Sequence, residues 1–496
     1  MSFQKVSFAR LANSENRESQ KTGMCIFGKH NRVNGTLWTA QINQKILCMT
    51  FLKELAKSAV QSCEIDKELY EKYDVKRGLR NADFSGVLVG LTNIGDVVGY
   101  KKDEQGKIIP AHGELYYRGI ELKDLCRGFQ QDGRHGFEEA AYLLLSGKLP
   151  NTSQLKEFSE MLTRERELPE FFSKNMILSL RGRSVMNMLA RSVLGLYTAD
   201  DEAENYSPEN LLKQSISLIA KFPVIVAYAY YGMRHSFQRK SLIIRHPQPE
   251  LSAAENFLYM LKGNKYTSLE ADLLDLSLVL HAEHGGGNNS SFTTRVVSSA
   301  QTDTYSAIAA ALGSLKGELH GGANLKVINM MNNIKQNVKN WEDENEVAEY
   351  LEKILNKKAN DGTGKIYGIG HAIYTLSDPR AVLLKEKAEE LAKEKGRLAE
   401  FKLYALIERI APEVFYKFKG SNSKVVCANV DFYSGFVYQC LDIPEEIYTP
   451  IFAVARIAGW CAHRIEEVTC SSRRIIRPAY KAVYPRLEYV PIQKRK

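Results

Sequence analysis

Apolar residues recur at positions i, i+3 and i+4 along most of the chain from about Leu122 onward. This spacing places side chains on one face of an α-helix. The windows that show it are 137–145, 155–162, 185–197, 211–231, 254–261, 271–280, 307–315, 347–355, 381–398 and 451–465. So many helical windows beside a single strand-rich patch predict a mainly α protein.

One earlier stretch follows the pattern of short strands and turns. Residues 86–91, 95–100 and 113–119 are rich in Val, Leu, Tyr and Gly. Such runs, bounded by glycines and polar residues, are typical of strands, and we expect them to form small hairpins. Residues 50–73, just before this stretch, return to helical spacing.

Residues 1–48 show no sustained period and are expected to be a leader outside the mature fold. A disordered tail, a start codon upstream of a true start at Met49, and a transit peptide are the three interpretations. Transit peptides are poor in acidic residues, so Glu15 and Glu18 weaken the third one.

The composition is that of a globular protein with room for two domains: 496 residues, 44% hydrophobic and 25% charged. These values exclude a wholly disordered, collagenous or disulfide-scaffold chain. The longest clean apolar stretch, about Phe222 to Tyr231, is shorter than the roughly 20 residues that a membrane span needs. We therefore expect no membrane partner.

The formal net charge of +9 is concentrated at the two ends of the chain. Residues 1–48 hold seven Lys/Arg and two Glu, and residues 471–496 hold eight Lys/Arg and one Glu, which leaves the body slightly acidic. A non-catalytic polyanion-binding protein would have to use these ends, and we expect no nucleic-acid partner for the body. The eight cysteines include no Cys-x-x-Cys pair, which favours reduced thiols and a cytoplasmic protein.

The first of four chemically unusual segments is residues 280–290, where His281 and His284 precede Gly285, Gly286 and Gly287. Two histidines at i and i+3 could bind zinc, but spacing reveals no third ligand, so we expect no metal. An oxyanion loop of an α/β-hydrolase is excluded because the chain has no Gly-x-Ser-x-Gly. A helix end with a glycine stop is the structural alternative.

The second segment, residues 317–324, places His320 between two helical windows. A histidine near a helix N-terminus is kept neutral by the helix dipole, and a neutral N–H can polarise a carbonyl oxygen. The alternative is a histidine that only caps the preceding helix.

The third segment runs from residue 367 to residue 380 and contains Gly-Ile-Gly-His371 followed by Asp-Pro-Arg380. The glycines let the backbone approach a ligand closely, and the proline fixes a turn. The planar guanidinium of Arg380 is suited to binding a carboxylate. A phosphate-binding loop is weakly supported without a preceding strand, and an ordinary flexible loop is the structural alternative.

The fourth segment, residues 426–435, places Asp431 among apolar and aromatic residues. Burial there would raise the pKa of the carboxyl and make it a competent carbon-acid base. A helix N-cap is the alternative for Asp431. Arg456 in an apolar helix and Arg477 before a proline also suggest anion binding, with a structural salt bridge as the alternative for each.

In this order and at these separations, the four segments resemble the citrate synthase family. Residues 117–120, 137–145, 220–223 and 255–258 also look like family segments, so the resemblance covers roughly residues 75–485. It implies a mainly helical homodimer with two domains in each subunit. The large domain would be 49–322 with 441–496, and the small closing domain 323–440.

The resemblance also implies roles for individual residues. His320 would hydrogen-bond the thioester oxygen of acetyl-CoA while Asp431 removes a methyl proton, and His371 would polarise the ketone of oxaloacetate. The substrate carboxylates would be bound by His284, Arg380 and Arg456, and by Arg477 from the partner subunit. Acetyl-CoA would be a substrate and CoA a product, with no tightly bound cofactor. The nearest alternative is 2-methylcitrate synthase, which uses propionyl-CoA.

Two features depart from the family pattern. No basic residue lies between His371 and Arg380 to meet a CoA phosphate, and Lys365 is only a weak substitute, so the CoA-binding residues stay unassigned. Glycines occupy 285–287, where other branches carry bulkier polar residues. The sequence therefore does not assign the residues that line the oxaloacetate pocket.

Overall fold

The computed structural model describes residues 50–81, 83, 85–420 and 425–495. The predicted leader, residues 1–48, lies outside these residues, so the predictions about it are not tested. The described chain divides into two compact units. The first contains the residues up to Arg77 together with Lys481 onward, and the second contains Gly78–Tyr480.

The first unit consists of short elements with exposed apolar side chains. It is helical over residues 50–62 and contains α2 (Glu68–Lys72) and the short helix η5 (Ile492–Lys494). Phe51, Leu487 and Tyr489 expose 65%, 74% and 82% of their surface. The sequence analysis assigned 49–77 and 481–496 to the large domain. That assignment stays a prediction.

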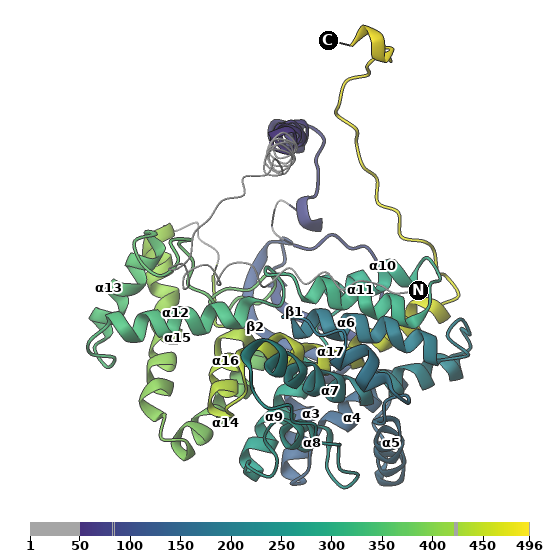
Figure 1. The fold of residues 1–496 in the computed structure, drawn as a ribbon. Helices are drawn as coiled ribbons and strands as arrows, with labels where there is room; N and C mark the ends of the chain where they lie inside the picture. The colour runs from purple at the N-terminus through teal and green to yellow at the C-terminus, as the bar shows by residue number, and fades with distance from the viewer. Residues whose placement is uncertain (1–49, 82, 84, 421–424, 496) are drawn as a thin grey trace, which may run out of the picture. The chain divides into compact units, whose positions relative to one another are not determined.

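The second unit is built from helices, which confirms the mainly α prediction (Figure 1). Its helices are α3 (Leu122–Gln131), α4 (Phe137–Ser146), α5 (Thr152–Glu165), α6 (Val185–Leu196), α7 (Pro208–Gln238), α8 (Ala253–Lys262), α9 (Ser268–His281), α10 (Asn289–Ser298), α11 (Thr304–Leu315), α12 (Ala323–Asn337), α13 (Glu344–Leu355), α14 (Pro379–Glu394), α15 (Leu398–Lys419), α16 (Val430–Cys440) and α17 (Tyr448–Thr469). Helix α17 lies at the centre and packs against α4, α7, α9, α10 and α11.

Helix α7 is the one described helix that is long and apolar enough to cross a membrane. The protein buries 94% of its most apolar window, and α7 packs against α5, α6, α8 and α17. Ser207 caps its N-terminus and Pro208 occupies its first turn, where a proline costs no hydrogen bond. The burial identifies α7 as a core helix.

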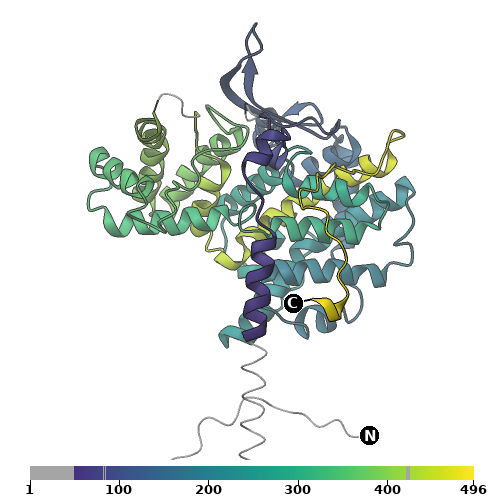
Figure 2. The same cartoon turned by 90° about the horizontal axis from the view of Figure 1, so that it is seen from above.

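Three antiparallel strands form one small sheet, β1 (Gly95–Lys102), β2 (Ile108–Tyr117) and β3 (Ile120–Glu121), in the order β1-β2-β3. The β1–β2 hairpin projects from the helices of this unit (Figure 2). These strands confirm the predictions for 95–100 and 113–119. The strand predicted over 86–91 is wrong: among the described residues this segment forms only an isolated bridge, Gly86 with Arg80, and Leu88 and Leu91 are 84% and 88% exposed.

The hairpin holds the loop that follows His371. Thr375 Oγ1 donates to the carbonyl oxygen of Gly99 at 2.5 Å and accepts from Ala111 N at 3.0 Å. A Cβ at Gly99 would lie 2.5 Å from the carbonyl oxygen of Ile373, so only glycine permits this approach. The close backbone contact positions the segment between His371 and Arg380.

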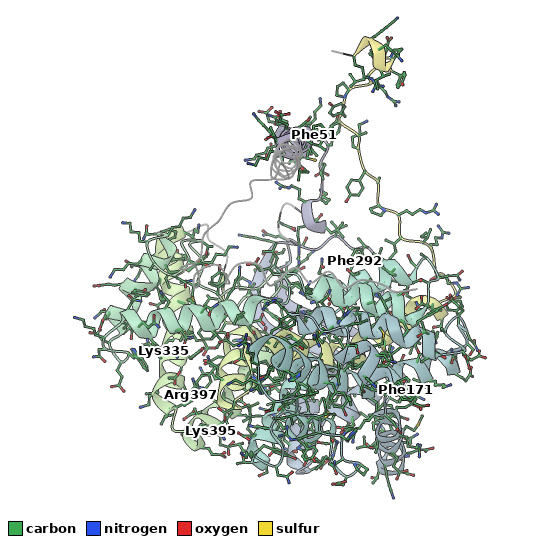
Figure 3. All side chains as sticks on the ribbon, in the orientation of Figure 1. Phe51, Phe171, Phe292, Lys335, Lys395 and Arg397 are labelled. Carbon is green, nitrogen blue, oxygen red and sulfur yellow. The ribbon has the colours of Figure 1, made fainter. Side chains whose placement is uncertain are left out.

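The predicted small domain, 323–440, begins at the first residue of α12 and ends at the last residue of α16. Figure 3 labels Lys335, Lys395 and Arg397 on this part of the chain. Lys395 Nζ reaches across the predicted boundary to Glu270 Oε1 on α9, at 2.6 Å. The boundary itself stays a prediction.

Candidate active site

His284 lies in the loop after α9, with only 6% of its surface exposed. Burial, followed by the charge of Arg380, holds the pKa of its imidazole well below the ordinary value. Its Nε2 is buried and has no hydrogen-bond partner among the described residues. The ring centroid lies 5.2 Å from that of His371. His284 is therefore a neutral group whose unpaired nitrogen a ligand could satisfy.

The neighbouring His281 has a structural role in this geometry. Its Nε2 lies 3.0 Å from Tyr438 Oη, and its ring stacks on Phe452 with the centroids 3.7 Å apart. Within the described part of the chain, no three His, Cys, Asp or Glu side chains are grouped closely enough to hold a metal ion. The zinc hypothesis for His281 and His284 thus has no third ligand there.

His320 lies in the turn between α11 and α12, as its position between two helical windows predicted. Its Nε2 is 3.1 Å from Ser290 Oγ, which also accepts a hydrogen bond from Trp460 Nε1 at 3.1 Å. Burial, together with the charge of Arg456, lowers the pKa of His320 to about 4. The imidazole is therefore neutral at pH 7, with one nitrogen anchored by the serine.

His371 is oriented by its own loop. Its Nδ1 accepts hydrogen bonds from the backbone N–H groups of Ile373, at 3.1 Å, and Tyr374, at 3.2 Å. Since Nδ1 is an acceptor, a neutral ring carries its proton on Nε2. The Tyr374 ring lies against it, with the centroids 4.7 Å apart. The geometry therefore makes His371 Nε2 a hydrogen-bond donor.

Arg380 is buried in the first turn of α14 and paired with Asp378. The guanidinium donates from Nε to Asp378 Oδ1 at 3.0 Å and from Nη2 to Oδ2 at 2.7 Å. Burial lowers the pKa of Arg380, but the charge and hydrogen bonds of Asp378 together with Tyr374 and Asp431 outweigh it, and the pKa is raised. A guanidinium has five N–H donors, so this pair leaves others for a substrate carboxylate. The pair with Asp378 therefore holds the Arg380 guanidinium in place and leaves donors for a ligand.

Asp431 is the second residue of α16, and it is not the N-cap. Asn429 is the cap, since its Oδ1 accepts a hydrogen bond from Asp431 N at 3.0 Å, and this makes the N-cap alternative for Asp431 wrong. Burial raises the pKa of the Asp431 carboxyl to about 6, although Arg380 opposes the rise. This confirms the predicted direction and suits a base that works near neutral pH.

Backbone hydrogen bonds tie the elements that carry His371, Arg380 and Asp431 to one another. Gly370 N donates to the carbonyl oxygen of Cys427 at 2.7 Å, and Asn429 N donates to that of Gly368 at 2.9 Å. Val430 N donates to Asp378 Oδ2 at 3.2 Å. The two loops and the start of α14 are thereby fixed as one framework.

Arg456 projects from α17 into the same region and is 2% exposed. Its Nε donates to the carbonyl oxygen of His281 at 2.5 Å. Burial lowers the pKa of Arg456, and the charge of Glu283 opposes this. Since no carboxylate of the described chain lies within 4.0 Å of it, the salt-bridge alternative does not account for Arg456.

Arg477 is the one predicted site residue that its own chain does not bring to the site. It is exposed in the extended segment after α17, next to Ile476, whose N–H donates to Ser299 Oγ at 3.1 Å. The other six predicted residues influence one another electrostatically: Arg380 and Arg456 act on both His284 and Asp431, and His320 and His371 act on His284.

Sequence reasoning gave no role to Asp378, Tyr374 or Ser290. An Asp directly before a proline is a typical N-cap with proline at the first helical position, so the sequence did contain a signal for Asp378. Tyr374 and Ser290 gave no comparable signal, because their roles depend on rings and hydroxyls from distant segments.

The arrangement combines a neutral histidine, a carboxyl with a raised pKa, a second histidine that donates from Nε2, and two buried arginines. The first two can polarise a carbonyl and remove a proton from the carbon beside it. The other groups can bind a carboxylate-bearing electrophile and protonate its oxygen. The site therefore suits carbon–carbon bond formation through an enol.

Comparison with known proteins agrees with this chemistry. The family model described as "Citrate synthase, C-terminal domain" matches residues 83–479. A citrate synthase from Synechocystis sp. is 36% identical over 77% of this chain and 88% of its own length. A 2-methylcitrate synthase from Shewanella oneidensis is 33% identical over 77% of this chain and 92% of its own length.

A solved structure gives the same result. The ternary complex of carboxymethyl coenzyme A and oxaloacetate with citrate synthase from Thermoplasma acidophilum aligns with a TM-score of 0.67 and 27% identity. The alignment covers 85% of this chain and 99% of that one. With a family model that spans the site and the helices around it, and relatives above 30% identity over three quarters of its length, this chain belongs to the citrate synthase family.

Proposed function

We propose that this enzyme condenses acetyl-CoA with oxaloacetate and water to give citrate and CoA. The observation that carries the proposal is a neutral His320 and an Asp431 carboxyl whose pKa is about 6, with the charge of Arg456 acting on both. A carbon acid as weak as a thioester methyl group needs both a base and a donor to the oxygen that becomes an enol.

The first step would use Asp431 and His320 together. Asp431 removes a proton from the methyl group of acetyl-CoA while His320 donates a hydrogen bond to the thioester oxygen. Nε2 of His320 lies beside Ser290 Oγ, at 3.1 Å, so the nitrogen left for the thioester oxygen is Nδ1, which donates in the Nδ1–H tautomer. The product of this step is the enol of acetyl-CoA.

The second step would join the enol to oxaloacetate. His371 Nε2–H donates to the ketone oxygen and transfers its proton as the carbon–carbon bond forms, since Nδ1 is occupied by two backbone donors. Arg380, Arg456 and His284 bind the substrate carboxylates and orient the ketone. Water then hydrolyses citryl-CoA, with closure of the small domain shielding the enol from solvent.

A thiol-release assay tests the function directly. Purified enzyme with acetyl-CoA and oxaloacetate is expected to release free CoA, and omission of oxaloacetate is expected to abolish the release. The named alternative is 2-methylcitrate synthase, favoured by the Shewanella relative. Initial rates with propionyl-CoA in parallel decide between the two, because one methylene discriminates by only about 1–3 kcal/mol. A clear propionyl-CoA preference would overturn the acetyl-CoA assignment.

We further propose that the partners are these small molecules rather than a nucleic acid or a membrane, and that no cofactor is tightly bound. Family membership supports an enzyme over the alternative of a polyanion-binding protein. A cytoplasmic location is proposed because the six described cysteines are all free thiols. Fractionation of cells that express the full chain tests the location.

The active form is proposed to be a homodimer in which each subunit lends Arg477 to the site of its partner. The support is that six of the seven predicted binding and catalytic residues converge within one chain, whereas Arg477 is exposed in an extended segment. An arginine placed this way is available to a second copy.

Mixed dimers test the shared site. Arg477→Ala and Asp431→Asn homodimers are each expected to be nearly inactive, whereas the co-purified mixed dimer is expected to recover about half of the wild-type rate per dimer. Recovery occurs because one of its two sites has both residues intact. An inactive mixed dimer would show that Arg477 acts within its own chain, and a fully active Arg477→Ala homodimer would show that it has no role in the site.

A further inference from the structure

Beneath the loop that carries His284 lies a buried carboxylate that the proposed chemistry does not use. Glu283 is fully buried, and its Oε1 lies 2.9 Å from His463 Nε2, also fully buried. Two glycines pack closely around Glu283 and its neighbour Ala282. A Cβ at Gly95 would come within 2.9 Å of Glu283 Cγ, and one at Gly459 within 2.4 Å of the Ala282 carbonyl oxygen. β1 and α17 therefore enclose Glu283 closely from two sides.

The other nitrogen of His463 is fixed from the opposite direction. Arg295 on α10 donates to His463 Nδ1 from Nε at 3.1 Å, and its Nη2 lies 2.8 Å from the same atom. A guanidinium can only donate, so Nδ1 is the acceptor and Nε2 carries the proton that is donated to Glu283. Arg295 is held in turn by Glu466, by Glu467 at 2.9 Å and by Thr92 at 2.9 Å.

This arrangement explains one of the three loop glycines. A Cβ at Gly286 would lie 3.3 Å from Arg295 Nε and 3.6 Å from His463 Cε1. The loop thus rests directly on the Arg295 and His463 side chains. The absence of a side chain at Gly286 therefore lets the loop lie directly against this support.

Glu283 is coupled to both substrate-binding groups of the loop region. Glu283 is adjacent in sequence to His284. Its negative charge also opposes the fall in the pKa of the buried Arg456. Arg456 in turn donates to the carbonyl oxygen of His281 at the other end of the same loop. Displacing Glu283 would therefore move His284 and remove the buried charge that supports Arg456.

We propose that Arg295, His463 and Glu283 form a positioning chain that holds His284 and Arg456 in place for the carboxylates of oxaloacetate. The inference rests on the proposed function for its substrate and assigns these residues no direct contact with it. Disrupting this chain is expected to weaken the binding of oxaloacetate but not that of acetyl-CoA. Asp431 and His320, which act on acetyl-CoA, lie on other segments.

Two substitutions at His463 separate the two hydrogen bonds. Gln places an amide N–H near the position of Nε2 and can keep the donor to Glu283, whereas Asn places its oxygen near Nδ1 and loses that donor. We expect His463→Asn to raise the KM and the calorimetric Kd for oxaloacetate about tenfold, the size of one hydrogen bond to a charged group. His463→Gln is expected to stay within about threefold of wild type.

A second variant tests the positioning chain if His463→Asn does not fold. Arg295→Met removes the donors to Nδ1 at a position near the surface, and it is expected to raise the oxaloacetate Kd by about three- to tenfold. His246→Asn is the control, because His246 is an exposed histidine outside the site whose Nδ1 lies 3.4 Å from Tyr228 Oη. It is expected to leave both KM values unchanged.

The outcomes separate this inference from the proposed function. Wild-type enzyme that does not bind oxaloacetate contradicts the function. Wild-type enzyme that binds it, together with His463→Asn and Arg295→Met variants of unchanged Kd, overturns the positioning chain. An equal rise in the KM for acetyl-CoA, or equal losses in His463→Asn and His463→Gln, would also overturn it, because the role would then be general support of the fold.

Discussion

Asp431→Asn is expected to lower kcat for citrate formation by about 10²- to 10⁴-fold, the usual contribution of a positioned general base. The amide keeps the size of the carboxyl but cannot accept the methyl proton. The KM for oxaloacetate is expected to change little, because Asp431 acts on the other substrate. Steady-state thiol release with each substrate varied in turn measures both quantities.

The pH profile gives an independent measurement on the same residue. Proton removal requires the carboxylate, and the pKa of Asp431 is raised to about 6, so kcat is expected to fall as the pH decreases through about 6. Above that pH the base is already ionised and the profile levels off. The residual activity of Asp431→Asn should lack this decrease.

Asp275→Asn is the matched control for Asp431. Asp275 is also a buried carboxyl, with a pKa that burial and Glu138 raise to about 7, but it accepts from the backbone N–H groups of Gly136 and Phe137. Its amide variant is expected to retain kcat and to lose only stability. A wild-type kcat in Asp431→Asn would contradict the assignment of the base.

Arg380→Gln is expected to raise the KM for oxaloacetate by about 100-fold, since two charge-assisted hydrogen bonds at about 1.5 kcal/mol each give a factor of this size. The same change leaves the fully buried Asp378 without its cation. Breaking a buried pair on one side costs about 3–5 kcal/mol. Thermal or denaturant unfolding, measured beside kinetics, separates the two effects.

The double variant Asp378→Asn/Arg380→Gln distinguishes stability from binding. Removing both charges is expected to recover most of the lost unfolding free energy, because no uncompensated buried charge remains. The raised KM should persist. Arg409→Gln is the control: its pair with Glu344 is exposed, so the cost is expected to be below about 1 kcal/mol. A double variant with restored KM would show that Arg380 acts only through the fold.

Local patterns predicted the helices well. The window 271–280 lies within α9, and 307–315 lies within α11. A helix buries every third or fourth residue, so residues close together in the sequence are enough to reveal it. The segment 86–91 has the composition of a strand, but a strand needs a partner along its length, and the described chain gives this segment only the isolated bridge between Gly86 and Arg80. Likewise, the N-cap of α16 is Asn429 and not Asp431, because it is the Asn429 side chain that reaches a free backbone N–H at the start of the helix.

By itself, the sequence determined the mainly helical class, the family and the types of group that do the chemistry. Only the tertiary structure decided which of those groups meet and in what state. His284, His371 and Asp431 lie on three separate segments, and the partner of Glu283 is 180 residues away. The apolar residues around Asp431 predicted the direction of its pKa shift, but the burial that produces the shift and the tautomer of His371 arise only when distant segments pack together and exclude water.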